Sequence, residues 1–399
     1  MRILIWASLL CLAWLAGPCQ ALDSADVLVV ANGNAPASRR VANAYMRSRM
    51  IAGERLVLLD VPDTAEISQA VYRTAIEQPV FSAARRTRTR CAVLCFGIPW
   101  RVVDAGPSPS ENCVSTRWAS VDAKLAAKGR AGSGGLRGVL NPYFGATVAF
   151  SRDDMLLVAR LDGLNEADAL ALVARGTGGV TRCVAAVLDQ QPVVNGVSNG
   201  LVAFYNDRLQ TAADHLRRAG CAVTLDAQQA LLPAAGSTAL FYWGWYAGPN
   251  GDAPTNTYQG FVWAPGAVGV HVCSFGAGDL RRAESAVPAL VHEGASATIG
   301  TVFEPLVEGW SRPDLFFANY VRGNNAGLTF IESAYSATPY LAWQQVFVGD
   351  PLLRAALPGR AQTPSPATES RLKPGESLRD LPRSPRGNPK PLISKEHEL

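Results

Sequence analysis

Short apolar runs alternate with amphipathic segments through most of the chain. Asp26–Asn32 (DVLVVAN), Arg55–Asp60 (RLVLLD) and Arg90–Phe96 (RCAVLCF) are predicted strands, and a predicted helix from Ser38 to Met50 separates the first two. The helix has apolar residues at helical spacing, whereas the three runs are almost continuously apolar, which is typical of strands buried on both faces. This order of elements predicts a parallel sheet with right-handed crossovers.

The same alternation continues to about residue 350. Predicted strands cover Met155–Leu161, Cys183–Leu188, Cys221–Leu225, Leu240–Trp243, Val268–Cys273 and Ala295–Val302. Predicted helices include Asp207–Ala219, Asp314–Val321 and Leu328–Ala337. Strands that alternate with helices indicate an α/β fold with parallel sheets flanked by helices. We expect two sequential α/β halves, 22–165 and 166–358, with the candidate site in the second half.

The two ends of the chain depart from this pattern. Residues 1–21 contain Arg2, the apolar run ILIWASLLCLAWLAG and small residues near Ala21, which is typical of a secretory signal peptide cleaved after Ala21. Residues 359–399 are rich in proline, serine and charged residues, and we expect a disordered tail. No second apolar span is present, so we expect a periplasmic or secreted protein that has no membrane partner after cleavage.

Composition narrows the possible ligands. The chain of 399 residues is 48% hydrophobic and has a formal net charge of +4, without a basic stripe that contains interleaved aromatic residues. Nucleic acid is therefore not an expected partner. Six of the eight cysteines follow the leader, and they form neither a CxxC motif nor a Cys/His cluster. We therefore predict no metal site and no cofactor.

The predicted strands 240–243 and 268–273 end in the densest group of reactive and aromatic side chains. Trp245 and Tyr246 follow the first strand, and His271, Cys273 and Ser274 lie at the end of the second. The carboxyl ends of parallel strands are where open α/β sheets bind ligands. We therefore place the candidate site at these two strand ends.

Cys273 is the candidate nucleophile. A cysteine acts as thiolate and needs a base or a positive field near neutral pH. His271 is two residues away and faces the same side of a regular strand, so it is the first candidate for that base, and His292 is the second. Ser274 is an alternative nucleophile, but the sequence identifies no base for it.

Charged residues form a second set of candidates. Asp162, Glu304 and Asp350 each follow an apolar run, so the topology of the sheet could gather them at one edge as a carboxylate pair for acid–base hydrolysis. The alternative is that they form turn or capping hydrogen bonds. Arg281 and Arg282 follow the Cys273 loop and could bind a carboxylate or phosphate, or simply be solvated surface charges.

Aromatic residues form a third set. Trp243, Trp245, Tyr246 and Trp263, with Tyr143, could provide a platform for a sugar ring or an extended peptide. Core packing is the alternative, and it suits Trp243 best. Trp245 and Tyr246 lie beyond the predicted strand end, where exposure to a ligand and burial in the core are both open.

Nine segments in one order resemble an uncharacterised family of exported bacterial proteins found mainly in species with the exosortase protein-sorting system. They span about residues 26–354 and read VVANGNAPASRRVANAYMRSRMI, FGIPWRV, ASVDAKL, NPYFG, ARLDG, YWGWYAG, VHVCSFGAGDLR, GASATIGTVFEP and WQQVFVGDPLL. The resemblance implies an exosortase-associated exported protein, but it supplies no activity.

Three shorter features resemble the caspase-like cysteine peptidases, especially the gingipain type. Cys273 and Gly276 lie at the end of one strand, and Gly349-Asp350-Pro351 closes the core. In those enzymes the preceding strand ends in His-Gly, and Trp245 stands here in the position of that histidine. The resemblance implies a caspase-like fold, and the tryptophan implies a degraded His–Cys site.

These features predict an exported caspase- or gingipain-like protein, a possible pseudoenzyme, that binds an extracellular or envelope ligand, either peptide or glycan. Trp245, Tyr246, Ser274, Arg281, Glu304 and Asp162 are the candidate ligand-binding residues. One alternative is an active hydrolase that uses Cys273 with His271, or a carboxylate pair. Another is a structural or assembly factor of the exosortase or exopolysaccharide surface system.

Overall fold

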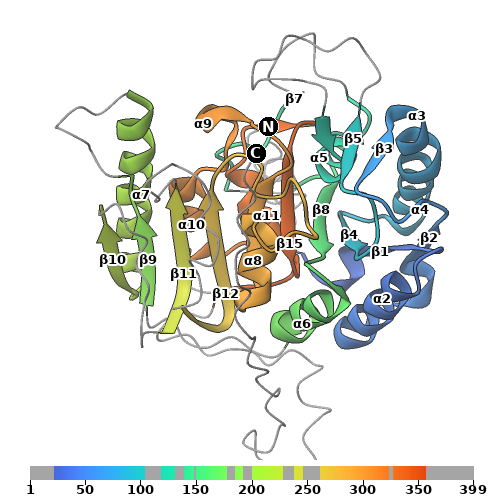
Figure 1. Ribbon diagram of the computed structural model, residues 1–399, viewed down its shortest axis with the longest axis horizontal. Coiled ribbons are helices and arrows are strands. Elements are labelled where there is room, and N and C mark those ends of the chain that lie inside the picture. The colour runs from blue at the N-terminus through green and yellow to red at the C-terminus, as the bar shows by residue number, and fades with distance from the viewer. Residues whose placement is uncertain are drawn as a thin grey trace, which may run out of the picture. The chain divides into compact units, whose positions relative to one another are not determined.

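The computed structural model describes residues 22–103, 118–130, 139–147, 150–177, 185–191, 200–227, 238–245, 261–322 and 327–355. The expected leader and the expected tail lie outside these ranges. Within the described residues, ten strands form one sheet in the order β10-β9-β11-β12-β13-β15-β8-β4-β1-β2 (Figure 1). In that order their bounds are Ala222–Asp226, Ala185–Asp189, Thr238–Trp245, Val262–Val272, Ala297–Thr301, Gln345–Gly349, Leu157–Leu161, Cys91–Cys95, Val27–Asn32 and Leu56–Leu59.

The expected α/β class, with a largely parallel sheet flanked by helices, is confirmed. The strands formed by residues before 165 lie together at one end of the sheet, and those formed by later residues occupy the other end. The strand β15, although formed by later residues, runs parallel to β8 and antiparallel to β13, so strand direction reverses between β13 and β15. The sheet therefore has its carboxyl-terminal strand ends on opposite edges in its two parts.

Helices cover both faces of the sheet. The helices α2 (Pro36–Arg49), α6 (Glu166–Thr177) and α8 (Ala286–Glu293) contact one another in series, as do α7 (Gly200–Arg218), α10 (Pro313–Tyr320) and α11 (Phe330–Ser336) (Figure 1). Shorter helices are α3 (Gln69–Val71), α5 (Val121–Ala126) and α9 (Leu306–Gly309), and a π-helical turn, Tyr72–Glu77, leads into α4 (Gln78–Thr87). The 3₁₀ turns Ser24–Asp26 and Gly53–Arg55 precede β1 and β2.

Two small sheets complete the described fold. One contains β3 (Glu66–Ser68), β5 (Arg101–Val103) and β6 (Trp118–Ser120), and the other pairs β7 (Val139–Leu140) with β14 (Tyr340–Leu341). The strand β3 directly precedes α3, and helical residues continue from Gln69 to Thr87.

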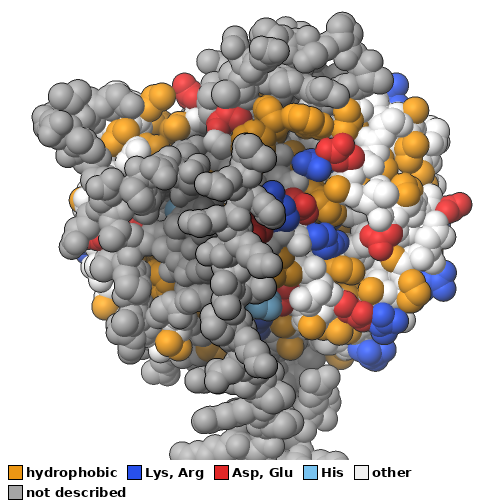
Figure 2. Space-filling view, in the orientation of Figure 1, with side chains coloured by type: hydrophobic (Ala, Val, Ile, Leu, Met, Phe, Trp, Pro, Cys, Tyr) orange, Lys and Arg blue, Asp and Glu red, His pale blue; other side chains and the backbone are white. Residues whose placement is uncertain are grey.

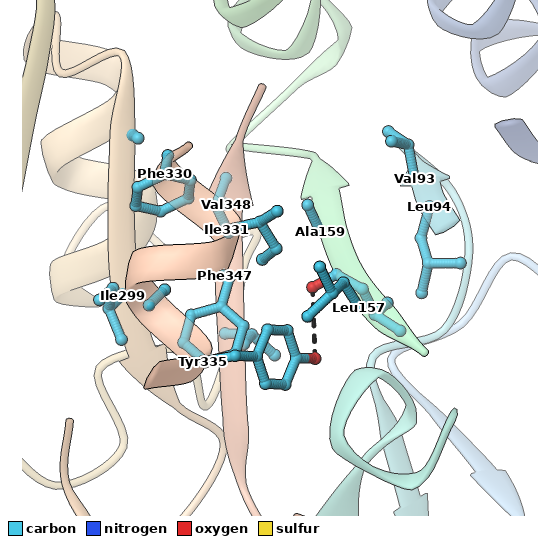
Figure 3. Close-up of a cluster of buried hydrophobic side chains, with 14 of the residues drawn as sticks. Val93, Leu94, Leu157, Ala159, Ile299, Phe330, Ile331, Tyr335, Phe347 and Val348 are labelled. Atoms are coloured by element: carbon cyan, nitrogen blue, oxygen red, sulfur yellow. Dashed lines mark hydrogen bonds between the residues drawn. The ribbon is translucent and has the colours of Figure 1, made fainter. Parts of the chain in front are cut away.

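The core lies along the middle of the large sheet. Leu157 and Ala159 of β8, Phe347 of β15 and the α11 residues Ile331 and Tyr335 are buried together (Figure 3). The Tyr335 hydroxyl donates a hydrogen bond of 3.4 Å to the backbone carbonyl of Val158 in β8. Nearly continuous burial along β1, β4 and β8 explains why their sequences are apolar without alternation.

Two observations concern the surface. Figure 2 shows acidic and basic side chains interspersed with apolar ones over the part of this face that carries described residues. Within the described ranges, no helix combines the length and the apolar character that crossing a membrane requires.

Candidate functional site

A row of four residues crosses the carboxyl-terminal ends of four parallel strands. Asp226 of β10 is the register partner of Asp189 in β9, Asp189 is the partner of Gly244 in β11, and Gly244 is the partner of His271 in β12. Register partners in a parallel sheet point to the same face, so these positions form one line above one face of the sheet. We call this set the edge row.

Gly244 leaves space for the side chain of Tyr242, two residues earlier on the same face. A Cβ atom at position 244 would lie 2.2 Å from the Tyr242 hydroxyl oxygen and 3.0 Å from the Cβ of Asp189. The phenol thus occupies the place of the missing side chain and lies between Asp189 and His271. Its oxygen is 3.5 Å from Nδ1 of His271, a long contact.

The two carboxylates of the edge row lie side by side in the protein interior. Asp189 is 0% exposed and Asp226 is 8% exposed. Within the described part of the chain, neither carboxylate oxygen of Asp189, nor Oδ2 of Asp226, has a hydrogen-bond partner of regular geometry. Burying a carboxylate without a cation or donors is unfavourable, which makes this pair the least compensated charge in the described site.

This environment shifts two ionisation equilibria. Burial, and then repulsion by Asp226, raise the pKa of Asp189 to about 8, and the Tyr242 hydroxyl opposes this shift only in part. Burial also lowers the pKa of His271 to about 4. Near pH 7 the edge row therefore contains a protonated Asp189 and an uncharged imidazole.

The histidines that the sequence suggests for Cys273 have other contacts. His271 faces Tyr242 through Nδ1, and Nδ1 of His292 lies 3.1 Å from Oδ1 of Asp168 in α6. Cys273 is a buried thiol outside any disulfide. An uncharged, buried His271 does not provide the positive field that stabilises a thiolate. The geometry therefore gives little support to a Cys273–His271 nucleophile.

Trp245 is not an exposed platform: of the two alternatives that the sequence leaves open for it, the structure has the buried one. The strand β11 continues to Trp245, two residues beyond its expected end, and the indole is 2% exposed. Its Nε1 donates a hydrogen bond of 2.9 Å to Asn206 of α7, and its ring lies 4.9 Å from that of Tyr205. Alternation places it on the face opposite the edge row. Tyr246 lies outside the described residues.

Ser274 and Glu304 are brought together at the ends of β12 and β13. The Ser274 hydroxyl donates a hydrogen bond to the Glu304 carboxylate, and both residues are half-buried. The adjacent Phe275 and Phe303 meet edge to face with ring centroids 4.6 Å apart. The structure thus supplies the acceptor for Ser274 that the sequence does not identify.

The expected gathering of Asp162, Glu304 and Asp350 at one edge is wrong. Asp162 and Asp350 follow the parallel strands β8 and β15, whereas Glu304 follows β13, which runs in the opposite direction. Asp350 instead accepts hydrogen bonds from Tyr45 and Arg49. Reversal of strand direction between β13 and β15 therefore separates Glu304 from Asp162 and Asp350.

Asp162 and Arg281 neutralise each other instead of facing a ligand. Nη1 of Arg281 is 2.7 Å from Oδ1 of Asp162, and Nη1 of the fully buried Arg160 is 3.1 Å from Oδ2. Arg160 also binds Asp122 through Nε and Nη2 at 2.8–3.0 Å. The guanidinium of Arg281 lies over the Phe96 ring at 4.1 Å. This network anchors the loop after β12 to β8.

Sequence reasoning therefore found His271, Ser274 and Glu304 near the strand ends but missed Asp189 and Asp226 as a pair. The available signal was that two predicted strands, CVAAVL and CAVTL, are each followed directly by aspartate. For a metal, the described residues offer no group of three or more His, Cys, Asp or Glu side chains placed to hold an ion.

Comparison with protein-family models and with curated proteins gives no match. Among solved structures, the Arg-specific cysteine proteinase gingipain R (RGPB) is similar with a TM-score of 0.49 and 11% sequence identity, over 85% of this chain and 80% of that chain. A complex of the Porphyromonas gingivalis RgpB pro- and mature domains gives 0.48 and 12%, over 83% and 80%. These scores lie below 0.5 at low identity, so they transfer neither catalytic residues nor a substrate.

Proposed function

We propose that the chain is a peptidase-like protein that binds a peptide through a cationic side chain, arginine or lysine, at Asp189 and Asp226, without using a Cys–His nucleophile. The observation that carries this proposal is the pair of buried, register-matched carboxylates that lack a cation among the described residues. A bound cation would compensate both carboxylates and allow Asp189 to ionise.

The donor chemistry of arginine fits this pair well. A guanidinium is planar, always charged and weakly hydrated, and it presents five N–H donors that match the oxygens of carboxylates. Three oxygens of the pair are buried without a hydrogen-bond partner of regular geometry among the described residues. Lysine would offer three donors from a more strongly hydrated ammonium group, so we expect it to bind less tightly.

The surroundings of Cys273 favour binding over covalent catalysis. The thiol is buried, and the neighbouring His271 has a pKa lowered to about 4 by burial, so a His271 imidazolium beside a thiolate is disfavoured near pH 7. The leader-like residues 1–21 favour a peptide from the cell envelope or from outside the cell.

A hydrolase that uses the same carboxylates is the second candidate. Asp189, with its pKa of about 8, is protonated near pH 7, and a second carboxyl group lies beside it. Two neighbouring carboxyl groups, one of them protonated, are the components that acid–base hydrolysis uses. This candidate predicts turnover of a peptide or glycoside that is lost on replacing Asp189 by Asn.

The binding proposal is tested by titration calorimetry at pH 8 with acetyl-arginine methylamide and its neutral analogue, acetyl-citrulline methylamide. We expect the arginine compound to bind and D189N to weaken it by roughly 10- to 100-fold, the usual worth of a hydrogen bond to a charged group. D153N is the control, because Asp153 is an 87% exposed carboxylate elsewhere on the chain. Equal binding of both compounds, or no effect of D189N, would refute the proposal.

A further inference from the structure

An aromatic cluster lies at the same edge of the sheet, beyond the edge row. Phe275, immediately after the end of β12, is 46% exposed. Its ring meets that of Phe303 at an angle of 84°, and Phe303 lies 4.7 Å from the ring of Trp118. We call Trp118, Phe275 and Phe303 the aromatic corner.

The backbone holds Phe275 in this exposed position at a cost. Its φ is +59°, in the left-handed region that an aromatic residue seldom adopts. The Phe275 amide donates to the Phe303 carbonyl at 3.4 Å, and its own carbonyl accepts from Gly278 at 2.7 Å. A Cβ at position 278 would lie 3.0 Å from that carbonyl, so the turn depends on glycine there. An exposed apolar ring on a strained backbone is a feature that occurs at functional sites.

The order of the strands gives the separation between the edge row and the aromatic corner. Asp189 ends β9, and Phe303 follows β13, three strands further along the order β9-β11-β12-β13. Neighbouring strands are about 4.8 Å apart, so the two positions are separated by roughly 14 Å across the strand ends. An extended peptide advances about 3.4 Å per residue and spans this distance in about four residues.

We propose that the aromatic corner is a second subsite of the same peptide ligand, which takes an aromatic or branched aliphatic side chain about four residues from the basic one. This inference rests on the proposed function, because the acidic pair fixes the register of the peptide. Its basis is that the edge row and the aromatic corner lie along the same edge of the sheet, and that the first is acidic and the second is aromatic. The hydrogen-bonded Ser274 and Glu304 are the chain neighbours of Phe275 and Phe303, and they place polar groups beside the aromatic corner.

The test uses synthetic peptides that contain one arginine and one phenylalanine. The series acetyl-Arg-(Gly)n-Phe-amide, with n from 0 to 5, is measured by titration calorimetry together with the reversed series and with partner peptides in which Gly replaces Phe. We expect the gain from Phe to peak at n = 3, at about tenfold, the worth of one aromatic contact.

Three variants separate the two proposals. F275A and F275N should remove the gain from Phe and leave the affinity of the all-glycine peptide unchanged, and asparagine also suits the left-handed backbone. F204A is the control, since Phe204 is an exposed phenylalanine (37%) on α7. D189N should weaken binding of every peptide in the series by roughly 10- to 100-fold.

If arginine peptides bind through Asp189 but Phe adds nothing, or F275A and F275N leave its gain intact, the aromatic subsite is refuted and the proposed function stands. A gain from Phe of equal size at every spacing also refutes the predicted register. If D189N has no effect on any peptide, the proposed function fails as well.

Discussion

The replacement of Asp189 by Asn should make the folded protein more stable, by an amount that grows as the pH rises from about 4 to about 8. Burial and the neighbouring Asp226 raise the pKa of Asp189 from 3.8 to about 8 in the folded state. Between these two values the unfolded chain releases its proton while the folded chain retains it. The free energy of unfolding of the natural protein therefore falls as pH rises from about 4 to about 8. Above that range the loss is complete, and this group adds no further pH dependence.

The magnitude follows from the size of the shift. Each pKa unit corresponds to about 1.4 kcal/mol, so a shift of about four units places an upper limit of roughly 6 kcal/mol on the destabilisation at pH 8. Asparagine has nearly the shape of the protonated acid and does not ionise. D189N should match the natural protein near pH 4 and exceed it by several kcal/mol, up to this limit, near pH 8.5.

Urea unfolding of the natural protein, D189N and D153N at pH 4.5, 6.5 and 8.5 measures this difference. Comparing variants at each pH cancels the contributions of all other titrating groups, and the exposed Asp153 controls for the loss of one surface charge. If the free energy of unfolding of D189N does not increasingly exceed that of the natural protein as pH rises, Asp189 is ionised or compensated in the folded state. The reasoning on the edge row would then be wrong.

Three further predictions concern single positions. G244A should lower the free energy of unfolding in urea by about 1–3 kcal/mol and weaken binding of the arginine peptide, because the added methyl group displaces the Tyr242 phenol. G53A is the control, since a Cβ there has no atom within 4 Å, and it should change neither quantity. R160M should destabilise the fold by about 3–5 kcal/mol, since it leaves Asp122 buried without its partner, and equal stability would argue against the network. C273A should keep full affinity for the arginine peptide. In the natural protein the buried Cys273 thiol should react with iodoacetamide far more slowly when the chain is folded than when it is unfolded in urea. Fast labelling of the folded chain would support Cys273 as a nucleophile.

The sequence was sufficient for the fold class because the pattern has simple causes. Strands such as β1 and β4 are buried on both faces, so their sequences are continuously apolar, and helices such as α7 show apolar residues at helical spacing. Strand ends were less certain. The apolar run of β11 was expected to end at Trp243, but Trp245 continues it and is buried against α7.

The site was harder to predict, because it depends on which strands are neighbours. The strands β9, β10 and β11 follow one another in the chain, but β9 lies between the other two in the sheet. Only this order places Asp189 beside both Asp226 and Gly244. Likewise, no local pattern shows that β15 reverses direction against β13, which separates Asp162 from Glu304.

Stability and binding make opposite demands on the edge row. An apolar or amide side chain at position 189 would remove an uncompensated buried carboxyl and stabilise the fold. Glycine at position 244 leaves the space that the Tyr242 hydroxyl occupies beside that carboxyl. Packing alone does not account for both choices in adjacent strands, whereas a ligand that brings a positive charge does. The measurement that joins the two arguments is proton release: near pH 7, binding of the arginine peptide should release up to one proton from the natural protein and none from D189N.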